Sequence, residues 1–130
     1  MKLFIFISLF FIASNLVAGD TAEVKAKPKI FYGTASFYSN SFHGKKTANG
    51  ETFSQQKFTA ACNVLPLGTW IKVTNLRNGK SVIVKTNDRL HSRMTRVVDL
   101  SRAAANKLSY VKSGLTRVKV EVLGKSKPEE

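Results

Sequence analysis

The clearest pattern along the chain is the alternation of apolar and polar residues on either side of a short turn. Residues 71–74 and 81–85 both alternate with a period of two, as half-buried β-strands do. Asn78 and Gly79 lie between them, and this pair tolerates the positive φ angles of a tight hairpin turn. The pattern therefore predicts a β-hairpin.

Similar but weaker patterns predict the remaining elements. Further strands are expected at residues 31–38, 96–99 and 117–123. Ser101 is suited to cap a short alanine-rich helix over residues 101–108. About five or six short strands with one small helix favour a compact, mainly β barrel over a βαβ sheet.

The N-terminal segment is typical of a secretory signal peptide. Lys2 precedes an apolar run at 3–12, and small and polar residues follow it, so residues 1–18 are expected to be removed near Ala18. The apolar run is shorter than the roughly 20 residues of a membrane-spanning helix. We therefore expect an exported protein, periplasmic or secreted, with no membrane span after cleavage.

The polar segments at both ends define the expected domain. Residues 19–29 contain Pro28 and lack periodicity, which predicts a flexible lead-in. The barrel domain is expected at residues 30–124, and residues 125–130 are expected to form a frayed tail. One domain of this size can fold as a monomer.

The charge balance indicates an anionic partner. The chain has 21 Lys and Arg against 8 Asp and Glu, a formal net charge of +13. Nucleic acid is not expected, because an exported protein rarely meets it, and acidic polymers of the cell envelope are the favoured class. The alternative is a basic surface that is merely solvated.

Cysteine and histidine usage excludes several site types. Cys62 is the only cysteine, so no internal disulfide can form and no cysteine near residue 18 is available for a lipid anchor. Two histidines and one cysteine at unrelated spacings do not form a metal-ligand set. We expect no metal and no cofactor.

A series of short motifs, in order along the chain, resembles a known family. The motifs are GTASFY at 33–38, FHGK at 42–45, TANGE at 47–51, LPLGT at 65–69, VTN at 73–75, NGK at 78–80, NDR at 87–89 and VDLS at 98–101. They resemble the rare lipoprotein A (RlpA)-like double-psi β-barrel proteins of the septal lytic transglycosylase type, over about residues 33–123. The resemblance implies a six-stranded double-psi β-barrel with one or two short helices. It also implies endolytic cleavage of peptidoglycan glycan strands to anhydro-ended products, in some members with a preference for strands stripped of stem peptides.

The sequence departs from that family in two respects. The lipid-bearing cysteine and the C-terminal repeat domain of some members are not found in it. Enzymatic members have a histidine after the Thr-Ala-Ala block, where this chain has Cys62, whereas the aspartate paired with that histidine matches Asp88. The alternative function is therefore a non-catalytic peptidoglycan-binding or wall-loosening module.

Cleavage of a glycosidic bond needs a proton for the departing oxygen and stabilisation of an oxocarbenium-like transition state. The expected catalytic residues are Asp88 as the acid or base, with Glu51 and Cys62 completing the cleft. Asp88 can instead be a turn aspartate that pairs with Arg89, and Glu51 can be plain surface charge. Cys62 has three interpretations: a buried core thiol, a replacement for the histidine, or a nucleophile paired with His43 or His91.

The flanking residues predict a glycan groove. The expected substrate-binding residues are Tyr38, Phe42, His43, Lys45, Asn49 and Arg89. Tyr38 and Phe42 are expected at the surface beside a polar loop, whereas most other aromatic residues of this region favour the barrel core. Asp99 is expected to fix the junction between the barrel and the helix rather than to take part in chemistry.

Overall fold

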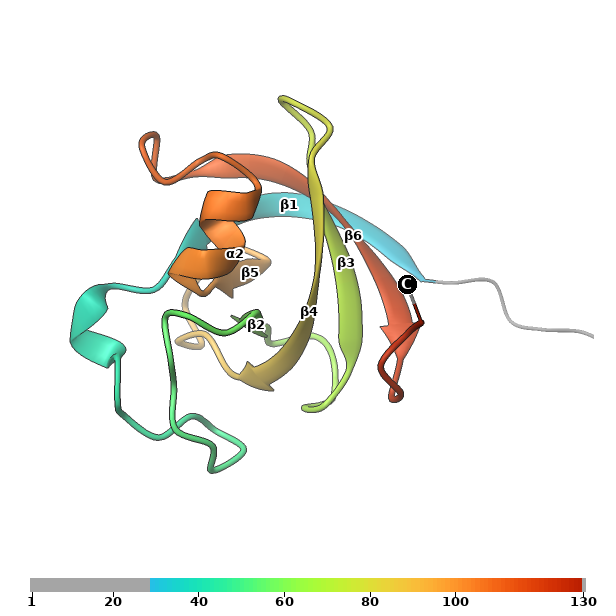
Figure 1. Cartoon of the computed structure of the whole chain (residues 1–130). Helices are drawn as coiled ribbons and strands as arrows, with labels where there is room; N and C mark the ends of the chain where they lie inside the picture. Colours follow the sequence, from blue (N-terminus) through green and yellow to red (C-terminus); the bar gives the residue numbers. More distant parts are fainter. Residues whose placement is uncertain (1–28, 130) are drawn as a thin grey trace, which may run out of the picture.

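The computed structural model describes residues 29–129 and shows a closed six-stranded β-barrel (Figure 1). The strands are β1 (Ile30–Phe37), β2 (Thr59–Ala61), β3 (Trp70–Asn75), β4 (Ser81–Asp88), β5 (Val98–Leu100) and β6 (Thr116–Gly124). Around the barrel they follow the order β1-β5-β2-β4-β3-β6. The expected signal peptide and residues 19–28 of the expected lead-in lie outside the described residues.

The predicted hairpin is confirmed. Strands β3 and β4 pair antiparallel, with Val73 opposite Val82, and the chain turns between them at Gly79, whose φ is 78°. Val73 and Val82 point into the barrel, as the alternation predicts. The strand expected near the C-terminus is also confirmed as β6, with Val118 and Val120 fully buried.

Two strand pairs are parallel, and they give the barrel its topology. Strand β1 pairs parallel with β5, and β2 pairs parallel with β4, whereas the other neighbours are antiparallel. Parallel neighbours need a connection that returns to the same end of the sheet. The sequence did not reveal β2, because three residues are too few to show an alternation.

The helix α2 (Arg102–Lys107) follows β5 directly, as predicted. Ser101 caps it, and its hydroxyl accepts a hydrogen bond from the Ala104 amide at 3.3 Å. The buried Ala104 and Ala105 face the barrel core. Within the part of the chain that the structure describes, no helix has the length and apolar character to span a bilayer.

A small second cluster of buried side chains lies beside the main core. It consists of Tyr38, Phe53, Ala61 and Leu90. The expectation that Tyr38 lies at the surface is wrong, because the residue is only 8% exposed and its ring stacks on Phe53 with 4.0 Å between ring centroids. The long segment between β1 and β2 therefore folds back onto the barrel wall and is anchored there by aromatic packing.

Candidate active site

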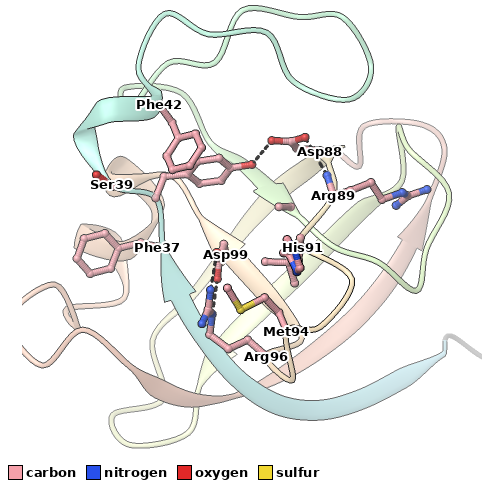
Figure 2. Close-up of a pocket in the computed structure, with 12 residues that line it drawn as sticks. Phe37, Ser39, Phe42, Asp88, Arg89, His91, Met94, Arg96 and Asp99 are labelled. Atoms are coloured by element: carbon pink, nitrogen blue, oxygen red, sulfur yellow. Dashed lines mark hydrogen bonds and ion pairs between the residues drawn. The ribbon is translucent and has the colours of Figure 1, made fainter.

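A cavity of about 540 Å³ lies where this folded segment meets the loop between β4 and β5 (Figure 2). Its lining includes two carboxylates, Asp88 at the end of β4 and Asp99 in the middle of β5. The other lining residues are Phe37, Tyr38, Ser39, Phe42, Ala61, Arg89, Leu90, His91, Met94 and Arg96. We refer to this cavity as the Asp88 cleft.

The two carboxylates belong to one row of residues across three neighbouring strands. Ala61 of β2 pairs with Asp88 on one side and with Asp99 on the other. Strands lie about 4.8 Å apart, so the Cα atoms of the two aspartates are separated by about 10 Å. Ala61 lies between them and lines the cleft, although it is only 2% exposed.

A β-bulge brings Asp88 into this row. Ala60 pairs with Thr86, whereas the next residue, Ala61, pairs with Asp88, so β4 uses two residues where β2 uses one. In an unbroken ladder Asn87 would lie beside Ala61, and Asp88 would point to the opposite face. Bulges commonly redirect a side chain in this way next to functional sites.

The Asp88 carboxylate accepts hydrogen bonds from three donors. The hydroxyl of Tyr38 donates to Oδ2 at 2.6 Å, and the amides of Ala48 and Arg89 both donate to Oδ1 at 2.9 Å. Burial, and then the hydrogen bond to Asp88, raise the pKa of Tyr38 well above its usual value, so its phenol stays protonated. Asp88 is therefore held in a fixed orientation with both oxygens engaged.

The loop at residues 47–51 positions the Ala48 amide. The Asn49 side-chain oxygen accepts hydrogen bonds from the Thr47 hydroxyl at 2.6 Å and from the Glu51 amide at 3.1 Å, which closes the turn. The Asn49 amide donates to the carbonyl of Asn87 at 3.2 Å and ties the turn to the end of β4. Asn49 was predicted to bind substrate. In the structure, its side chain and its backbone amide are occupied in holding the loop together.

Glu51 lies in a neighbouring pocket rather than in the Asp88 cleft. Its carboxylate accepts a hydrogen bond from the side-chain Nδ2 of Asn87 at 3.1 Å and lies 3.7 Å from Lys85 Nζ. The hydrogen bond from Asn87 lowers the pKa of Glu51, and contacts with Asn49 and Lys85 lower it further. The structure does not bring Glu51 and Asp88 together in one cleft, although Asn87 links Glu51 to the residue beside Asp88.

Cys62 also lies apart from the cleft, in the barrel core. Its side chain is fully buried, and burial raises the pKa of its thiol. The two histidines that a nucleophilic thiol would need as partners have other contacts. His43 Nδ1 accepts a hydrogen bond from the backbone amide of Gln55, and His91 Nδ1 accepts one from the backbone amide of Arg93. Of the three interpretations of Cys62, the structure favours the buried core thiol, because a nucleophile has to reach its substrate.

Arg89 contacts Asp88 through its backbone amide, whereas its side chain holds a neighbouring segment of the chain. Its guanidinium donates to the carbonyl oxygens of Cys62 and Leu65 at 2.5 and 2.6 Å and points away from Asp99 (Figure 2). These bonds fasten the segment after β2 to the end of β4. The predicted substrate contact by the Arg89 side chain therefore competes with a structural role.

Three further residues expected to bind substrate lie on the segment after β1. Phe42 is 48% exposed and lines the Asp88 cleft, and its ring packs edge-on against Tyr38. Lys45 Nζ lies 5.8 Å from the centre of the Phe42 ring. Of these three, Phe42 lines the cleft, whereas Lys45 and His43 lie outside its lining.

The sequence did not identify Asp99 and Arg96 as part of the site. The Asp99 carboxylate lines the cleft and accepts two hydrogen bonds from Arg96, from Nε at 2.8 Å and from Nη2 at 3.1 Å. The buried Val98 and Leu100 on either side show that Asp99 points outward from the barrel. That alternation was visible in the sequence, but the position of Asp99 beside Asp88 depends on the closure of the barrel.

Comparison with protein families and curated proteins identifies similar chains. The sequence model of the lytic transglycolase family matches residues 30–120. The chain is 57% identical over 89 residues to the endolytic peptidoglycan transglycosylase RlpA of Pseudomonas aeruginosa (strain UCBPP-PA14), which covers 68% of this chain and 26% of that protein. It is 48% identical over 98 residues to the protein of the same name from Neisseria meningitidis (serogroup B), covering 74% of this chain and 41% of that protein. The chain thus spans less than half the length of these curated relatives.

Solved structures with a similar fold are more distant in sequence. The Streptomyces papain inhibitor superposes with a TM-score of 0.60 at 20% identity, over 73% of this chain and 94% of that chain. The expansin of Clavibacter michiganensis superposes with a TM-score of 0.61 at 18% identity, over 77% of this chain and 53% of that chain. At these identities the likeness concerns the fold alone.

Proposed function

Because this chain belongs to the lytic transglycolase family of double-psi β-barrel proteins, we propose that it is an endolytic peptidoglycan lytic transglycosylase that cleaves glycan strands to anhydro-ended products. The curated relatives are named for this activity, and they support the proposal over the matched domain. The substrate lies outside the cytoplasmic membrane, so the proposal includes export of the chain by the leader expected at residues 1–18. Monomeric action without a lipid anchor is part of the same proposal.

The observation that carries the proposal is the fixed carboxylate of Asp88 in an open cleft. Lytic transglycosylation transfers a proton to the departing glycosidic oxygen and removes one from the sugar's own hydroxyl, which attacks the anomeric carbon and closes the anhydro ring. The two proton transfers cancel, so one carboxyl group can perform both in turn. Cys62 is buried, and Asp88 is therefore proposed to act as acid and then as base without a histidine partner.

Tyr38 suits this sequence of proton transfers. A phenol hydroxyl can donate to an ionised carboxylate and can also accept a hydrogen bond from a carboxylic acid. Rotation of the Tyr38 hydroxyl therefore accompanies the change of protonation at Asp88 Oδ2, which it contacts at 2.6 Å. The amides of Ala48 and Arg89 hold Oδ1 in place throughout.

The proposal is tested with Asp88→Asn and mass spectrometry of the soluble products from purified sacculi. The unchanged chain is expected to release anhydro-ended fragments, and Asp88→Asn is expected to release none while its melting temperature stays close to that of the unchanged chain. Glu121→Gln is the matched control. Glu121 pairs with Lys119 on β6, so this substitution also removes one carboxylate, but from the barrel surface outside the cleft. Full turnover by Asp88→Asn would refute the assignment.

The alternative function is a module that binds peptidoglycan or loosens the wall without cleaving it. The burial of Cys62, at the position where the resemblance places a catalytic histidine, is the observation in its favour. This alternative predicts that the unchanged chain sediments with sacculi and that no anhydro-ended fragment appears in solution. The same experiment therefore separates the two functions.

A further inference from the structure

Two exposed leucines and two arginines gather at one end of the barrel. Leu76 and Arg77 follow β3 in the turn to β4, and Leu115 and Arg117 flank the first residue of β6. Leu76 is 48% exposed and Leu115 is 51% exposed, so both present apolar surface to water. Leu115 and the two arginines line a shallow depression of about 330 Å³. We refer to these four residues as the end patch.

Hydrogen bonds join the two segments that carry the end patch. The Leu76 amide donates to the Arg117 carbonyl at 2.9 Å, which continues the pairing of β3 with β6 beyond Asn75. Asn75 Oδ1 accepts hydrogen bonds from the Thr116 hydroxyl at 2.7 Å and from the Arg77 amide at 3.0 Å. The backbone that carries the end patch is therefore ordered by the barrel itself.

The charge of this end of the barrel is positive. Residues 76–80 and 109–117 contain no Asp or Glu, and their cations are Arg77, Lys80, Lys112 and Arg117. The ion pairs within the described part of the chain involve other cations, so both arginines of the end patch remain available to an anion from outside. A second copy of this chain fits the patch poorly, because face-to-face contact would bring like charges together.

The end patch and the Asp88 cleft lie at opposite ends of the barrel. Strand β4 runs from the turn at Ser81 to Asp88, and its eight residues at about 3.3 Å each place the two ends roughly 20 Å apart. Figure 1 shows the turn between β3 and β4 and the loop before β6 at one end, and the arrowhead of β4 at the other. A surface bound at the end patch would therefore leave the cleft open.

We propose that the end patch binds the surface of a bilayer that contains anionic phospholipids, with its arginines at the phosphate groups and its leucines between the headgroups. An anionic membrane attracts basic residues, and exposed apolar side chains among them gain free energy by leaving water. A soluble acidic polymer can pair with the arginines, but it offers no apolar layer to the leucines. The presence of both kinds of side chain on one ordered end of the barrel favours the lipid surface. This binding goes beyond the proposed function and leaves the cleft free for a second partner.

The test measures binding of the chain to sedimented lipid vesicles. The chain is used without residues 1–18, because their apolar run would itself bind lipid, and the closed barrel forms its own core without them. Vesicles of phosphatidylcholine are compared with vesicles of phosphatidylcholine and phosphatidylglycerol in equal amounts. We expect about tenfold stronger binding, or more, to the vesicles with phosphatidylglycerol, and we expect this binding to weaken as salt is added.

Paired substitutions assign the binding to the end patch. Arg77→Gln combined with Arg117→Gln is expected to weaken binding to the anionic vesicles about 25-fold, or about fivefold for each arginine. Lys46→Gln combined with Arg93→Gln is the matched control, because it removes the same charge from two exposed residues outside the end patch, and it is expected to change binding by less than about threefold. Thermal unfolding checks that each variant is folded.

Substitution of the leucines separates a bilayer from a soluble polyanion. Leu76→Gln combined with Leu115→Gln keeps the charge and is expected to weaken binding to the anionic vesicles about tenfold, because the apolar surface is lost. A polarity-sensitive dye on Leu115→Cys should shift its emission to the blue when these vesicles are added, whereas the same dye on Lys46→Cys should not. Cys62 is buried, so the dye is expected to react at the introduced cysteine.

Three results would each overturn the inference. The first is equal binding to the two kinds of vesicle. The second is an equal loss of binding in the arginine pair and in its control, which would show attraction by net charge alone. The third is unchanged binding by the leucine pair, which would indicate a polyanion site without insertion. Cleavage of sacculi is scored separately without vesicles, where the end-patch variants are expected to match the unchanged chain, so neither proposal decides the other.

Discussion

Replacing Tyr38 by Phe isolates the contribution of one hydrogen bond to catalysis. The change removes the hydroxyl that donates to Asp88 Oδ2 at 2.6 Å. It keeps the ring, which stacks on Phe53 with 4.0 Å between centroids and packs edge-on against Phe42 at 5.7 Å. The apolar packing of the segment after β1 is therefore preserved, and Asp88 keeps its two amide donors on Oδ1.

The size of the effect follows from the kind of bond that is lost. A hydrogen bond to a charged group contributes about 1.5–3 kcal/mol. Asp88 is only partly buried, and water can replace the phenol at Oδ2, so the loss falls near the lower end of this range. A barrier increase of about 1.4 kcal/mol lowers kcat about tenfold. We expect Tyr38→Phe to lose about tenfold in kcat with little change in stability.

The matched control is Tyr110→Phe. Tyr110 is also buried, and its hydroxyl also donates one hydrogen bond, at 2.7 Å, but the acceptor is the Ser36 carbonyl. Tyr110 does not line the cleft. Removal of the Tyr110 hydroxyl leaves the Ser36 carbonyl without this donor, and it is expected to lower the free energy of unfolding by about 1–3 kcal/mol without changing kcat.

The assay combines the rate of anhydro-fragment release from sacculi with urea unfolding of both variants. The expected result is a crossed pattern, in which Tyr38→Phe loses turnover and Tyr110→Phe loses stability. Wild-type turnover by Tyr38→Phe would refute the reasoning, because Tyr38 would then serve only to pack the segment. Parallel losses of turnover and stability in both variants would refute it as well.

Three further predictions concern residues outside the Asp88 cleft. Burial raises the pKa of the Cys62 thiol, so on raising the pH the unfolded chain loses the thiol proton before the folded chain does, and the free energy of unfolding should fall above the pKa of a free thiol, about 8.5. Urea unfolding at increasing pH should show a smaller fall for Cys62→Ala, and an equal fall in both chains would contradict the burial. Gly33→Ala should destabilise the barrel by about 1–3 kcal/mol, because the added Cβ would lie 2.2 Å from Val97 Cγ1; thermal unfolding should show partial rescue when Val97→Ala is combined with it, and the absence of rescue would point to another cause. Glu51→Gln should keep kcat within about threefold, because the Glu51 carboxylate lies outside the Asp88 cleft and the neutral Gln oxygen can accept the same hydrogen bond from Asn87. A loss of kcat comparable to that of Asp88→Asn would indicate that Glu51 takes a direct part in cleavage of sacculi.

The strands with regular alternation could be predicted from the sequence, whereas the barrel's closure could not. The hairpin of β3 and β4 and the strand β6 follow from periodicity, because each buries one face over at least six residues. Strand β2 has only three residues. It pairs parallel with β4 and antiparallel with β5, and both partners lie far from it in the sequence. No local pattern encodes such pairings, and the six-stranded barrel was expected only from the family resemblance.

The candidate site was predictable to the same extent. Asp88 was predicted from the family resemblance together with its position after an apolar strand, and the structure places it in the lining of a cavity of about 540 Å³. Asp99 and Arg96 were missed, because their nearness to Asp88 arises from the row through Ala61 and from the bulge at Asn87. Glu51 shares a loop with residues that contact Asp88, yet its side chain points to the neighbouring pocket, and sequence spacing does not determine that direction.

The main-chain contacts of Cys62 hold the segment after β2 against the end of β4, where Asp88 lies. The amide of Cys62 donates to the backbone carbonyl of Asp88 at 3.0 Å, and the carbonyls of Cys62 and Leu65 accept from the Arg89 guanidinium. All the atoms that residue 62 contributes to these bonds belong to the main chain, so they are independent of its side chain. The bonds that join the segment after β2 to the end of β4 therefore do not involve the thiol of Cys62. Under the function proposed above, Asp88 performs both proton transfers, and Tyr38 is the side chain that contacts its Oδ2 atom.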